Sequence, residues 1–294
     1  MSYLSDEITS QPDVWSTAIA RAASLSAAGT LPAPGERVAV IGCGSSLNVA
    51  RAYARLREAA GHGPTDGYPA SELVSTRDYD HMVFISRTGT TTEVLAALRE
   101  IPSNIRTTSL TATESAPLAR ETSNLVLLDF ADERSVVSSR FITAAIVLLR
   151  AHLGEDLSAL PAAAAAELTR PLPAELADRA EYTFLGCGWA SFVADEAALK
   201  LREASRTWAE SYPAMEYRHG PISVSDPDTV VWGIGEIPAS LAADAARTGA
   251  TVINRGGDPL LGLIGAQRLA VTLADRKAIN PDQPRSLSRS VILA

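Results

Sequence analysis

The chain has 294 residues, a formal net charge of −8 and no run of lysines or arginines. This length allows two domains of ordinary size, each with its own core. The acidic balance argues against nucleic acid as the main partner, because binding to a phosphate backbone needs a basic face.

The cysteines and the apolar stretches indicate a cytoplasmic protein that does not contact a membrane. Cys43 and Cys187 form neither a disulfide framework nor a CxxC pair, which favours a reducing compartment. The first residues lack the charged and apolar regions of a signal peptide. The longest strongly apolar stretch, residues 141–149, is far shorter than the roughly 20 residues that span a bilayer and is expected to form a buried helix.

Strand and helix patterns alternate along most of the chain after an apolar-periodic helix at 6–28. In the first half we expect strands at 37–42, 81–86, 105–111 and 124–129, and helices at 46–60, 91–100 and 136–153. In the second half we expect strands at 181–186, 229–234, 250–254 and 268–273, and helices at 191–207 and 238–248. Such alternation predicts parallel sheets covered by helices on both faces.

The same pattern divides the chain into five segments. We expect an N-terminal helical segment (1–30), a first domain (31–157), a helical linker (158–179), a second domain (180–279) and a C-terminal tail (280–294). The apolar end of the tail, Val291-Ile292-Leu293, suggests that the tail docks on a domain.

Two short motifs recur at one offset, which indicates that one fold is used twice. Gly42-Cys43-Gly44 returns as Gly186-Cys187-Gly188, and Tyr68-Pro69-Ala70 returns as Tyr212-Pro213-Ala214; 187 minus 43 and 212 minus 68 are both 144. Each Gly-Cys-Gly follows an apolar strand and opens a helix, where backbone N–H groups can face an anion. Leu47 stands where a dinucleotide fingerprint has its third glycine, which argues against NAD.

Hydroxyl side chains crowd the loop Ser86-Arg87-Thr88-Gly89-Thr90-Thr91 after the second predicted strand. Hydroxyl and N–H donors of this kind suit the three oxygens of a monophosphate. The alternative is that these residues only form a turn and a helix cap. A third segment, Glu133 to Ser139, places more hydroxyls at a helix start. The alternative is that these residues only form a capping box.

Together these segments resemble the sugar isomerase (SIS) domain family. The motifs are Gly-Cys-Gly-Ser-Ser at 42–46, Ile-Ser-Arg-Thr-Gly at 85–89, Glu-Arg-Ser-Val-Val-Ser-Ser at 133–139 and Glu-Tyr-Arg-His-Gly-Pro at 216–221. The chain is most similar to the isomerase half of glucosamine-6-phosphate synthase and to the amino-sugar-phosphate ketose/aldose isomerase and deaminase group. The resemblance implies two tandem SIS domains, each a flavodoxin-like parallel sheet flanked by helices.

The resemblance also implies a homodimer with a shared active site and a set of site residues. Glu203 matches the general base that moves a proton between C1 and C2 of the sugar, and His219 matches a ring-opening histidine that comes from the neighbouring subunit. The substrate- and phosphate-binding positions are Cys43, Gly44, Ser45, Ser46, Ser86, Arg87, Thr88, Thr91, Val136, Ser138 and Arg289.

Glu203 and His219 also suit the chemistry, because isomerisation needs a proton shuttle to open the ring and a carboxylate to carry the proton between C1 and C2. As plainer alternatives, Glu203 is a solvated helix residue between Arg202 and Arg206, and His219 shapes a turn. We expect no cofactor and no metal, since the four histidines include no HxxxH pair and no Cys cluster is present.

Two departures from the synthase limit this reading. The chain shows no glutaminase domain and no cysteine at position 2, so we do not expect it to release ammonia from glutamine. Arg289 stands where the synthase has an active-site lysine, and arginine does not form a Schiff base at ordinary pH. The arginines at positions 87 and 218 resemble the motifs of the deaminase and isomerase group more than those of the synthase.

The sequence therefore predicts a phosphosugar isomerase acting on an amino-sugar or sugar 6-phosphate, with or without loss of ammonia. A fructosamine-6-phosphate deglycase and a non-catalytic sugar-phosphate sensor are the alternatives. A sensor usually carries a DNA-binding segment, and residues 1–35 show no helix-turn-helix and no basic arm.

Overall fold

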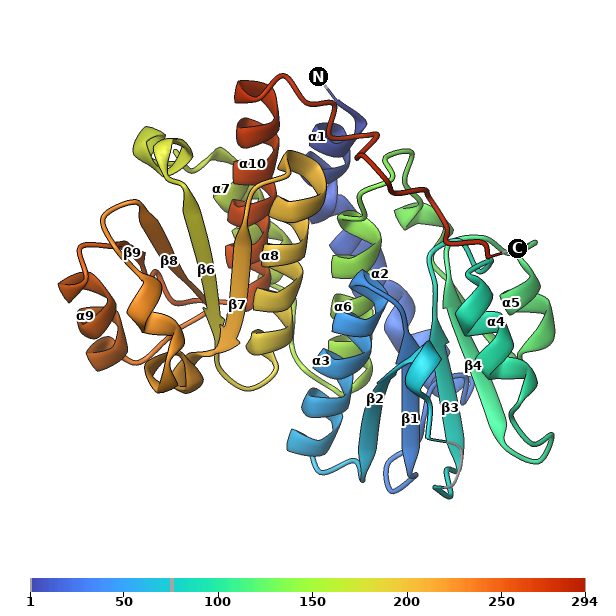
Figure 1. Cartoon of the computed structure of the whole chain (residues 1–294). Coiled ribbons are helices and arrows are strands. Elements are labelled where there is room, and N and C mark those ends of the chain that lie inside the picture. Colours follow the sequence, from blue (N-terminus) through green and yellow to red (C-terminus); the bar gives the residue numbers. More distant parts are fainter. Residues whose placement is uncertain (1, 75–76, 294) are drawn as a thin grey trace. The chain divides into compact units, whose positions relative to one another are not determined.

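The computed structural model of the chain describes residues 2–74 and 77–293 (Figure 1). The chain forms two compact units, each built around its own parallel sheet. The first sheet belongs to a unit made of Ser10–Arg134, Ser138–Pro161 and the residues from Leu287 onward. The second sheet belongs to a unit made of the residues up to Thr9, Ser135–Val137 and Ala162–Ser286.

The first sheet has five parallel strands in the order β2-β1-β3-β4-β5. This is the flavodoxin-like order. The order in which strands are added to the sheet reverses between β1 and β3, and ligands bind beyond the carboxyl ends of those two strands. The strands are β1 (Val38–Gly42), β2 (Thr65–Pro69), β3 (His81–Ile85), β4 (Arg106–Thr111) and β5 (Asn124–Leu127).

Helices cover both faces of this sheet (Figure 1). On one face lie α2 (Gln11–Ala27), α3 (Ser45–Ala59) and α6 (Arg140–His152), and on the other lie α4 (Thr92–Arg99) and α5 (Pro117–Glu121). The apolar run in α6 is buried from Phe141 to Arg150, as the sequence predicts. Trp15 of α2 is fully buried and donates a hydrogen bond to the hydroxyl of Thr143 in α6 at 2.8 Å.

The second sheet has four parallel strands in the order β7-β6-β8-β9, which matches the first four strands of the first sheet. The strands are β6 (Glu181–Gly186), β7 (Ala209–Pro213), β8 (Thr229–Ile234) and β9 (Thr251–Ile253). The helices of this part of the chain are α1 (Tyr3–Thr9), α7 (Leu160–Thr169), α8 (Ala190–Ser205), α9 (Ala239–Arg247) and α10 (Pro259–Arg276). In Figure 1, α8 and α10 lie on one face of the sheet and α9 lies on the other.

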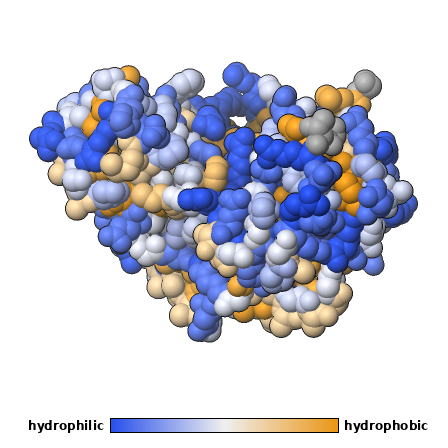
Figure 2. Space-filling model, turned by 90° about the horizontal axis from the view of Figure 1, so that it is seen from below, coloured by the Kyte–Doolittle hydropathy of each residue, from blue (hydrophilic) through white to orange (hydrophobic). Residues whose placement is uncertain are grey.

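Short 3-10 helices complete the described structure: η1 (Ala70–Glu72), η2 (Asp129–Ala131), η3 (Ala174–Asp178), η4 (Ala214–His219) and η5 (Pro221–Val224). Across residues 2–74 and 77–293, no helix is both long enough and apolar enough to cross a membrane. Hydrophilic residues cover most of the face shown in Figure 2, with smaller hydrophobic patches between them.

Several predicted elements differ from the structure. The strand predicted at 268–273 is wrong, because these residues belong to α10, whose buried Leu269, Ala270 and Leu273 follow helical spacing. Strands β2 and β7 were not predicted, because they are short edge strands of mostly intermediate burial and lack an apolar run. The single helix predicted at 6–28 is two helices, α1 and α2.

Candidate active site

Glycines at the carboxyl ends of β1 and β6 let the following helices approach the strands closely. A Cβ on Gly42 would lie 2.6 Å from the carbonyl carbon and oxygen of Ser46, and one on Gly186 would lie 2.2 Å from the carbonyl oxygen of Ala190. Gly44 and Gly188 adopt positive φ values of 54° and 57°. The two turns therefore have corresponding conformations, and both require glycine.

The first of these turns places Cys43, Ser45 and Ser46 at the carboxyl end of β1, partly exposed. Burial raises the pKa of the Cys43 thiol, so the thiol is protonated near neutrality. A protonated, half-buried cysteine fits a small turn residue better than a nucleophile.

The loop after β3 brings its hydroxyl groups close together. The Oγ atoms of Ser86 and Thr91 lie 3.2 Å apart, and the Ser86 hydroxyl also accepts a hydrogen bond from the N–H of Gly89 at 3.2 Å. Thr90 donates to the Oγ1 of Thr88 at 3.1 Å. Gly89 has a φ of 63°, and a Cβ there would lie 2.5 Å from the Cβ of Ala116. We call residues 86–91 the hydroxyl loop.

The C-terminal tail lies against the hydroxyl loop and the start of α4. The Ser290 hydroxyl accepts hydrogen bonds from Thr88 at 3.2 Å and from Thr90 at 2.9 Å. The N–H of Thr92 donates to the carbonyl of Val291 at 3.1 Å, and the Thr92 hydroxyl accepts from the N–H of Leu293 at 3.0 Å.

Docking of the tail is confirmed, but its physical basis differs from the one expected. The side chains of Val291, Ile292 and Leu293 are 48%, 71% and 57% exposed, so the apolar groups do not anchor the tail. Backbone groups, the Ser290 hydroxyl and the Arg289 guanidinium make polar contacts with the rest of the unit instead. Ser290 was not among the residues predicted from the sequence.

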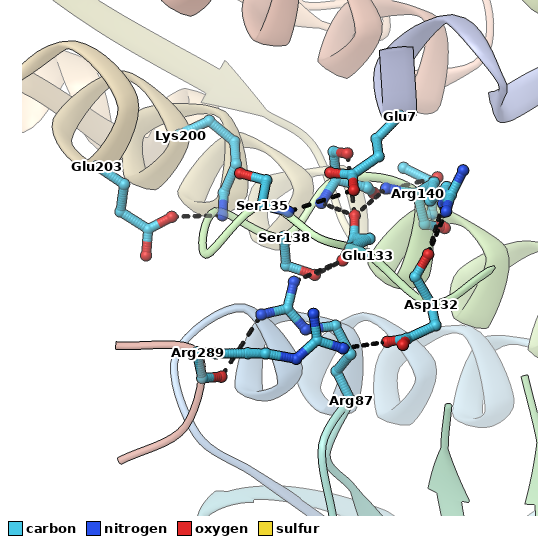
Figure 3. A network of polar contacts seen from close by, with 12 residues as sticks. Glu7, Arg87, Asp132, Glu133, Ser135, Ser138, Arg140, Lys200, Glu203 and Arg289 are labelled. Carbon is cyan, nitrogen blue, oxygen red and sulfur yellow. Dashed lines mark hydrogen bonds and ion pairs between the residues drawn. The ribbon is translucent and has the colours of Figure 1, made fainter. Parts of the chain in front are cut away.

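A buried carboxylate, Glu133, connects the hydroxyl loop to the start of α6 (Figure 3). The guanidinium of Arg87 donates to Glu133 Oε2 at 2.8 Å, and the Ser138 hydroxyl donates to the same oxygen at 2.7 Å. Burial alone raises the pKa of Glu133, but the charge of Arg87 and the hydrogen bonds outweigh burial and hold the pKa below its usual range. Glu133 is therefore ionised at neutral pH.

Arg289 is the tail position that the sequence analysis assigned to the substrate. Its guanidinium donates to the carboxylate of Asp132 at 2.5 Å, and its own carbonyl accepts from Arg87 at 3.5 Å (Figure 3). The side chains of Arg289 and Asp132 are 37% and 43% exposed, so this ion pair lies at the surface.

In the other unit, a buried lysine lies beside the predicted base on α8. Lys200 donates to Glu203 Oε2 at 2.5 Å (Figure 3). It also pairs with Glu196 Oε1 at 3.2 Å. The side chains of Lys200, Glu196 and Glu203 are 2%, 1% and 20% exposed. Burial lowers the pKa of Lys200, but the two carboxylates outweigh burial and raise the pKa overall, so the lysine stays charged. The partner of Glu203 is thus Lys200, at a helical spacing readable from the sequence.

His219 lies at the end of η4, in the same unit as Glu203, and is exposed. Its neighbour Arg218 donates to the carboxylate of Asp244 at 2.6 Å and to the Ser240 hydroxyl at 3.0 Å. Val136 also belongs to this unit, and its N–H donates to the carbonyl of Asp282 at 3.1 Å.

The predicted site residues thus divide between the two units. The unit of the first sheet holds Cys43, Gly44, Ser45, Ser46, Ser86, Arg87, Thr88, Thr91, Ser138 and Arg289, and the unit of the second sheet holds Val136, Glu203 and His219. Among the described residues, no group of three or more His, Cys, Asp or Glu side chains is placed to hold a metal ion.

Similar proteins match most of this chain. The chain is 28% identical to the glutamine–fructose-6-phosphate aminotransferase of Gluconobacter oxydans, over 88% of this chain and 52% of the relative. It is 30% identical to the enzyme of the same name from Pseudomonas putida, over 86% and 51%. The chain therefore spans about half the length of the curated relatives it matches.

Solved structures share the fold. The glucosamine-6-phosphate deaminase of Thermotoga maritima superposes with a TM-score of 0.82 at 24% identity, over 99% of this chain and 100% of that chain. The tagatose-6-phosphate ketose/aldose isomerase of Escherichia coli gives a TM-score of 0.81 at 18% identity, over 98% and 97%. At these identities the likeness concerns the fold, and the predicted fold class is confirmed.

The family model described as "SIS domain" matches residues 33–153 and 175–256, which together make up more than half of the chain. These two segments contain the two parallel sheets and the two Gly-Cys-Gly turns. The chain belongs to the SIS domain family.

Proposed function

We propose that this protein is a phosphosugar isomerase that interconverts the aldose and ketose forms of a sugar 6-phosphate, most suitably an amino sugar. The hydroxyl loop carries this proposal: four hydroxyl groups and a glycine follow β3, beside the point where the strand order reverses. Ligands of open parallel sheets bind at this place. The names of the relatives and structural neighbours, which concern hexose phosphates, support the same substrate class.

In this proposal the hydroxyl loop holds the phosphate. Ser86, Thr88 and Thr91 supply hydroxyl donors. Gly89 lets the loop turn at a positive φ and pack closely against Ala116. The sugar is held by residues of the Gly-Cys-Gly turn and of the segment before α6, namely Cys43, Gly44, Ser45, Ser46, Val136 and Ser138.

Two residues carry the chemistry. His219 moves the proton that opens the sugar ring, and Glu203 takes a proton from one of the two carbons C1 and C2 and returns it to the other. Lys200 restrains the Glu203 carboxylate by an ion pair at 2.5 Å. Because Lys200 is buried, charged and flanked by two carboxylates, it does not act as a Schiff-base nucleophile in this scheme.

The fate of the nitrogen defines the alternatives. Arg289 keeps a positive charge at the tail position but does not form an imine with the open ketose. We therefore propose isomerisation as the basic reaction and deamination as an extension for amino sugars. A fructosamine-6-phosphate deglycase and a non-catalytic sensor are the competing outcomes of the test.

The test is thermal stabilisation by a panel of phosphorylated sugars, followed by assays for ketose and ammonia. The panel contains fructose, tagatose, glucosamine and fructosamine 6-phosphates, each with its unphosphorylated counterpart. We expect stabilisation by a 6-phosphate but not by its counterpart, loss of the effect in Ser86→Ala, and an intact effect in the exposed control Ser103→Ala. Binding without turnover of any sugar would favour the sensor, and no binding at all would reject the proposal.

We further propose that the protein is a cytoplasmic homodimer that shares its active site between subunits, as the family resemblance implies. Both cysteines are free, which suits a reducing compartment. Light scattering after size-exclusion chromatography tests the dimer: a mass near 62 kDa, twice the 31.0 kDa of the chain, is expected. A mass of one chain at micromolar concentration would contradict it.

A further inference from the structure

Arg87 lies inside the hydroxyl loop, yet its side chain is directed to a carboxylate on another segment (Figure 3). Its side chain is 8% exposed, and that of its partner Glu133 is 0% exposed. The Nη1–Oε2 distance of 2.8 Å is that of a charge-assisted hydrogen bond. The guanidinium also reaches the carbonyl of Arg289 in the tail at 3.5 Å. Arg87 thus contacts both the segment before α6 and the tail.

The other contacts of Glu133 organise the start of α6. Its Oε1 accepts from the N–H of Ser139 at 2.5 Å, the hydroxyl of Ser139 at 3.0 Å and the N–H of Arg140 at 2.7 Å. Its Oε2 accepts from the Ser138 hydroxyl at 2.7 Å as well as from Arg87. One carboxylate therefore caps the helix and fixes the Ser138 hydroxyl.

We propose that Arg87 and Glu133 are a positioning pair that holds the hydroxyl loop and the Ser138 segment in one fixed arrangement, so that Arg87 acts on the substrate through Glu133. The proposal rests on the proposed function, in which the loop binds the phosphate and Ser138 binds the sugar. Arg87 is then no direct phosphate ligand, in contrast to the role that the family resemblance gives this position.

The electrostatics favour this role over direct binding. A guanidinium whose charge is matched by a buried carboxylate at 2.8 Å contributes little net positive charge to the loop. Turning Arg87 toward a phosphate would leave the Glu133 carboxylate buried without its counter-ion, which is strongly unfavourable. The hydroxyl and N–H groups of the loop remain as the phosphate donors.

A double-mutant cycle separates the two roles. Fructose 6-phosphate and inorganic phosphate serve as probes, and their affinities are measured by calorimetry for the wild type, Arg87→Met, Glu133→Gln and the double variant. A positioning pair predicts that each single change weakens fructose 6-phosphate binding about tenfold, and that the double change costs little more than either alone. A direct phosphate ligand predicts that Glu133→Gln leaves phosphate binding unchanged or strengthens it, which would overturn the proposal.

Controls exclude a general loss of folding. Arg99 and Glu121 form an exposed ion pair in the same unit, with side chains 61% and 34% exposed, and Arg99→Gln should leave both affinities unchanged. Arg87→Lys keeps the charge in a different geometry and should restore part of the affinity. If Arg87→Met does not fold, Arg87→Lys and Ser138→Ala complete the comparison, and Ser138→Ala should weaken fructose 6-phosphate binding but not inorganic phosphate binding.

Hydrogen exchange tests the positioning pair even if no sugar phosphate binds. A failure of the positioning-pair proposal can therefore be distinguished from a failure of the proposed function. We expect Glu133→Gln to speed exchange at the amides of 88–91, although Glu133 lies outside that loop. We expect Arg87→Met to speed exchange at the amides of Ser139 and Arg140, which Glu133 caps. Unchanged exchange in both segments would contradict the proposal.

Discussion

The Nζ of Lys200 lies 2.5 Å from Oε2 of Glu203 and 3.2 Å from Oε1 of Glu196, so one buried ammonium joins two carboxylates on α8. The three residues occupy one face of the helix because they are spaced by four and three positions. The ammonium restrains the carboxylate that we propose as the base, and it offsets the charge of a second carboxylate that is 1% exposed.

Replacing Lys200 with methionine should destabilise the protein strongly. The change removes the cation that pairs with the buried Glu196 carboxylate, and loss of one partner of a buried ion pair costs about 3–5 kcal/mol. Urea denaturation measures the change in the free energy of unfolding. As a control, Arg276→Gln removes an ion pair to Asp178 in which both side chains are largely exposed and should cost less than about 1 kcal/mol. Equal, small effects of the two changes would contradict this account.

His81 should make stability depend on pH. The side chain is fully buried, its Nε2 lies 2.7 Å from the Thr108 hydroxyl, and Arg106 donates to its Nδ1 at 3.1 Å. Burial, and next the charge of Arg106, lower its pKa from 6.5 to about 4. Between about pH 4 and pH 6.5 the unfolded chain therefore binds a proton at His81 that the folded chain does not bind.

The stability that neutral His81 contributes should be complete above pH 6.5 and should be lost as the pH falls toward 4. A difference of about 2.5 in pKa corresponds to at most about 3.5 kcal/mol at about 1.4 kcal/mol per unit of pKa. The measurement is the free energy of unfolding at several pH values for the wild type and His81→Gln. The variant should lose this part of the pH dependence, and parallel curves would disprove the assignment.

A side chain at Gly42 or Gly186 should destabilise the protein. A Cβ at either position would overlap backbone atoms of the following helix, at 2.6 Å and 2.2 Å, so the helix must shift away from the strand. We expect Gly42→Ala and Gly186→Ala each to cost about 1–3 kcal/mol, as overpacking usually does. Gly29→Ala tests backbone strain alone, since Gly29 has a φ of 66° and open space around it. If all three changes cost the same, crowding is not the reason.

The tail should become accessible to trypsin when its polar contacts are removed. Ser290→Ala combined with Asp132→Asn removes the hydrogen bonds to Thr88 and Thr90 and the ion pair of Arg289. We expect cleavage after Arg289 to become several times faster while the melting temperature changes little, because these contacts are at least partly exposed. Cleavage at the wild-type rate would show that the backbone contacts of Val291 and Leu293 suffice.

Much of the fold follows from the sequence because the buried parallel strands are short apolar runs. The predicted strands at 181–186 and 229–234 agree with β6 and β8. Edge strands β2 and β7 carry polar residues and were not predicted. The apolar face of α10 led to the wrong prediction of a strand at 268–273. Local patterns do not distinguish a buried helix face from a buried strand over so few residues.

The residue types of the site could be predicted, but their contacts could not. Arg87 and Glu133 stand in two separate motifs, 46 positions apart, and only the folded sheet brings them to 2.8 Å. The contact between the hydroxyl loop and Ser290 spans about 200 positions and is equally invisible in the sequence. The ion pair of Lys200 with Glu203 was within reach, because residues three positions apart are neighbours on a helix.

Turnover of the hexose 6-phosphate panel by the wild type and by Glu203→Gln is the direct test of the proposed isomerase activity. We expect the wild type to convert one phosphorylated sugar to its aldose or ketose isomer, and Glu203→Gln to bind this sugar but convert it at least about 100-fold more slowly. We also expect the transferred proton to exchange with deuterium from the solvent. Conversion by Glu203→Gln at the wild-type rate, or binding of a sugar phosphate with no conversion by the wild type, would contradict the proposed activity.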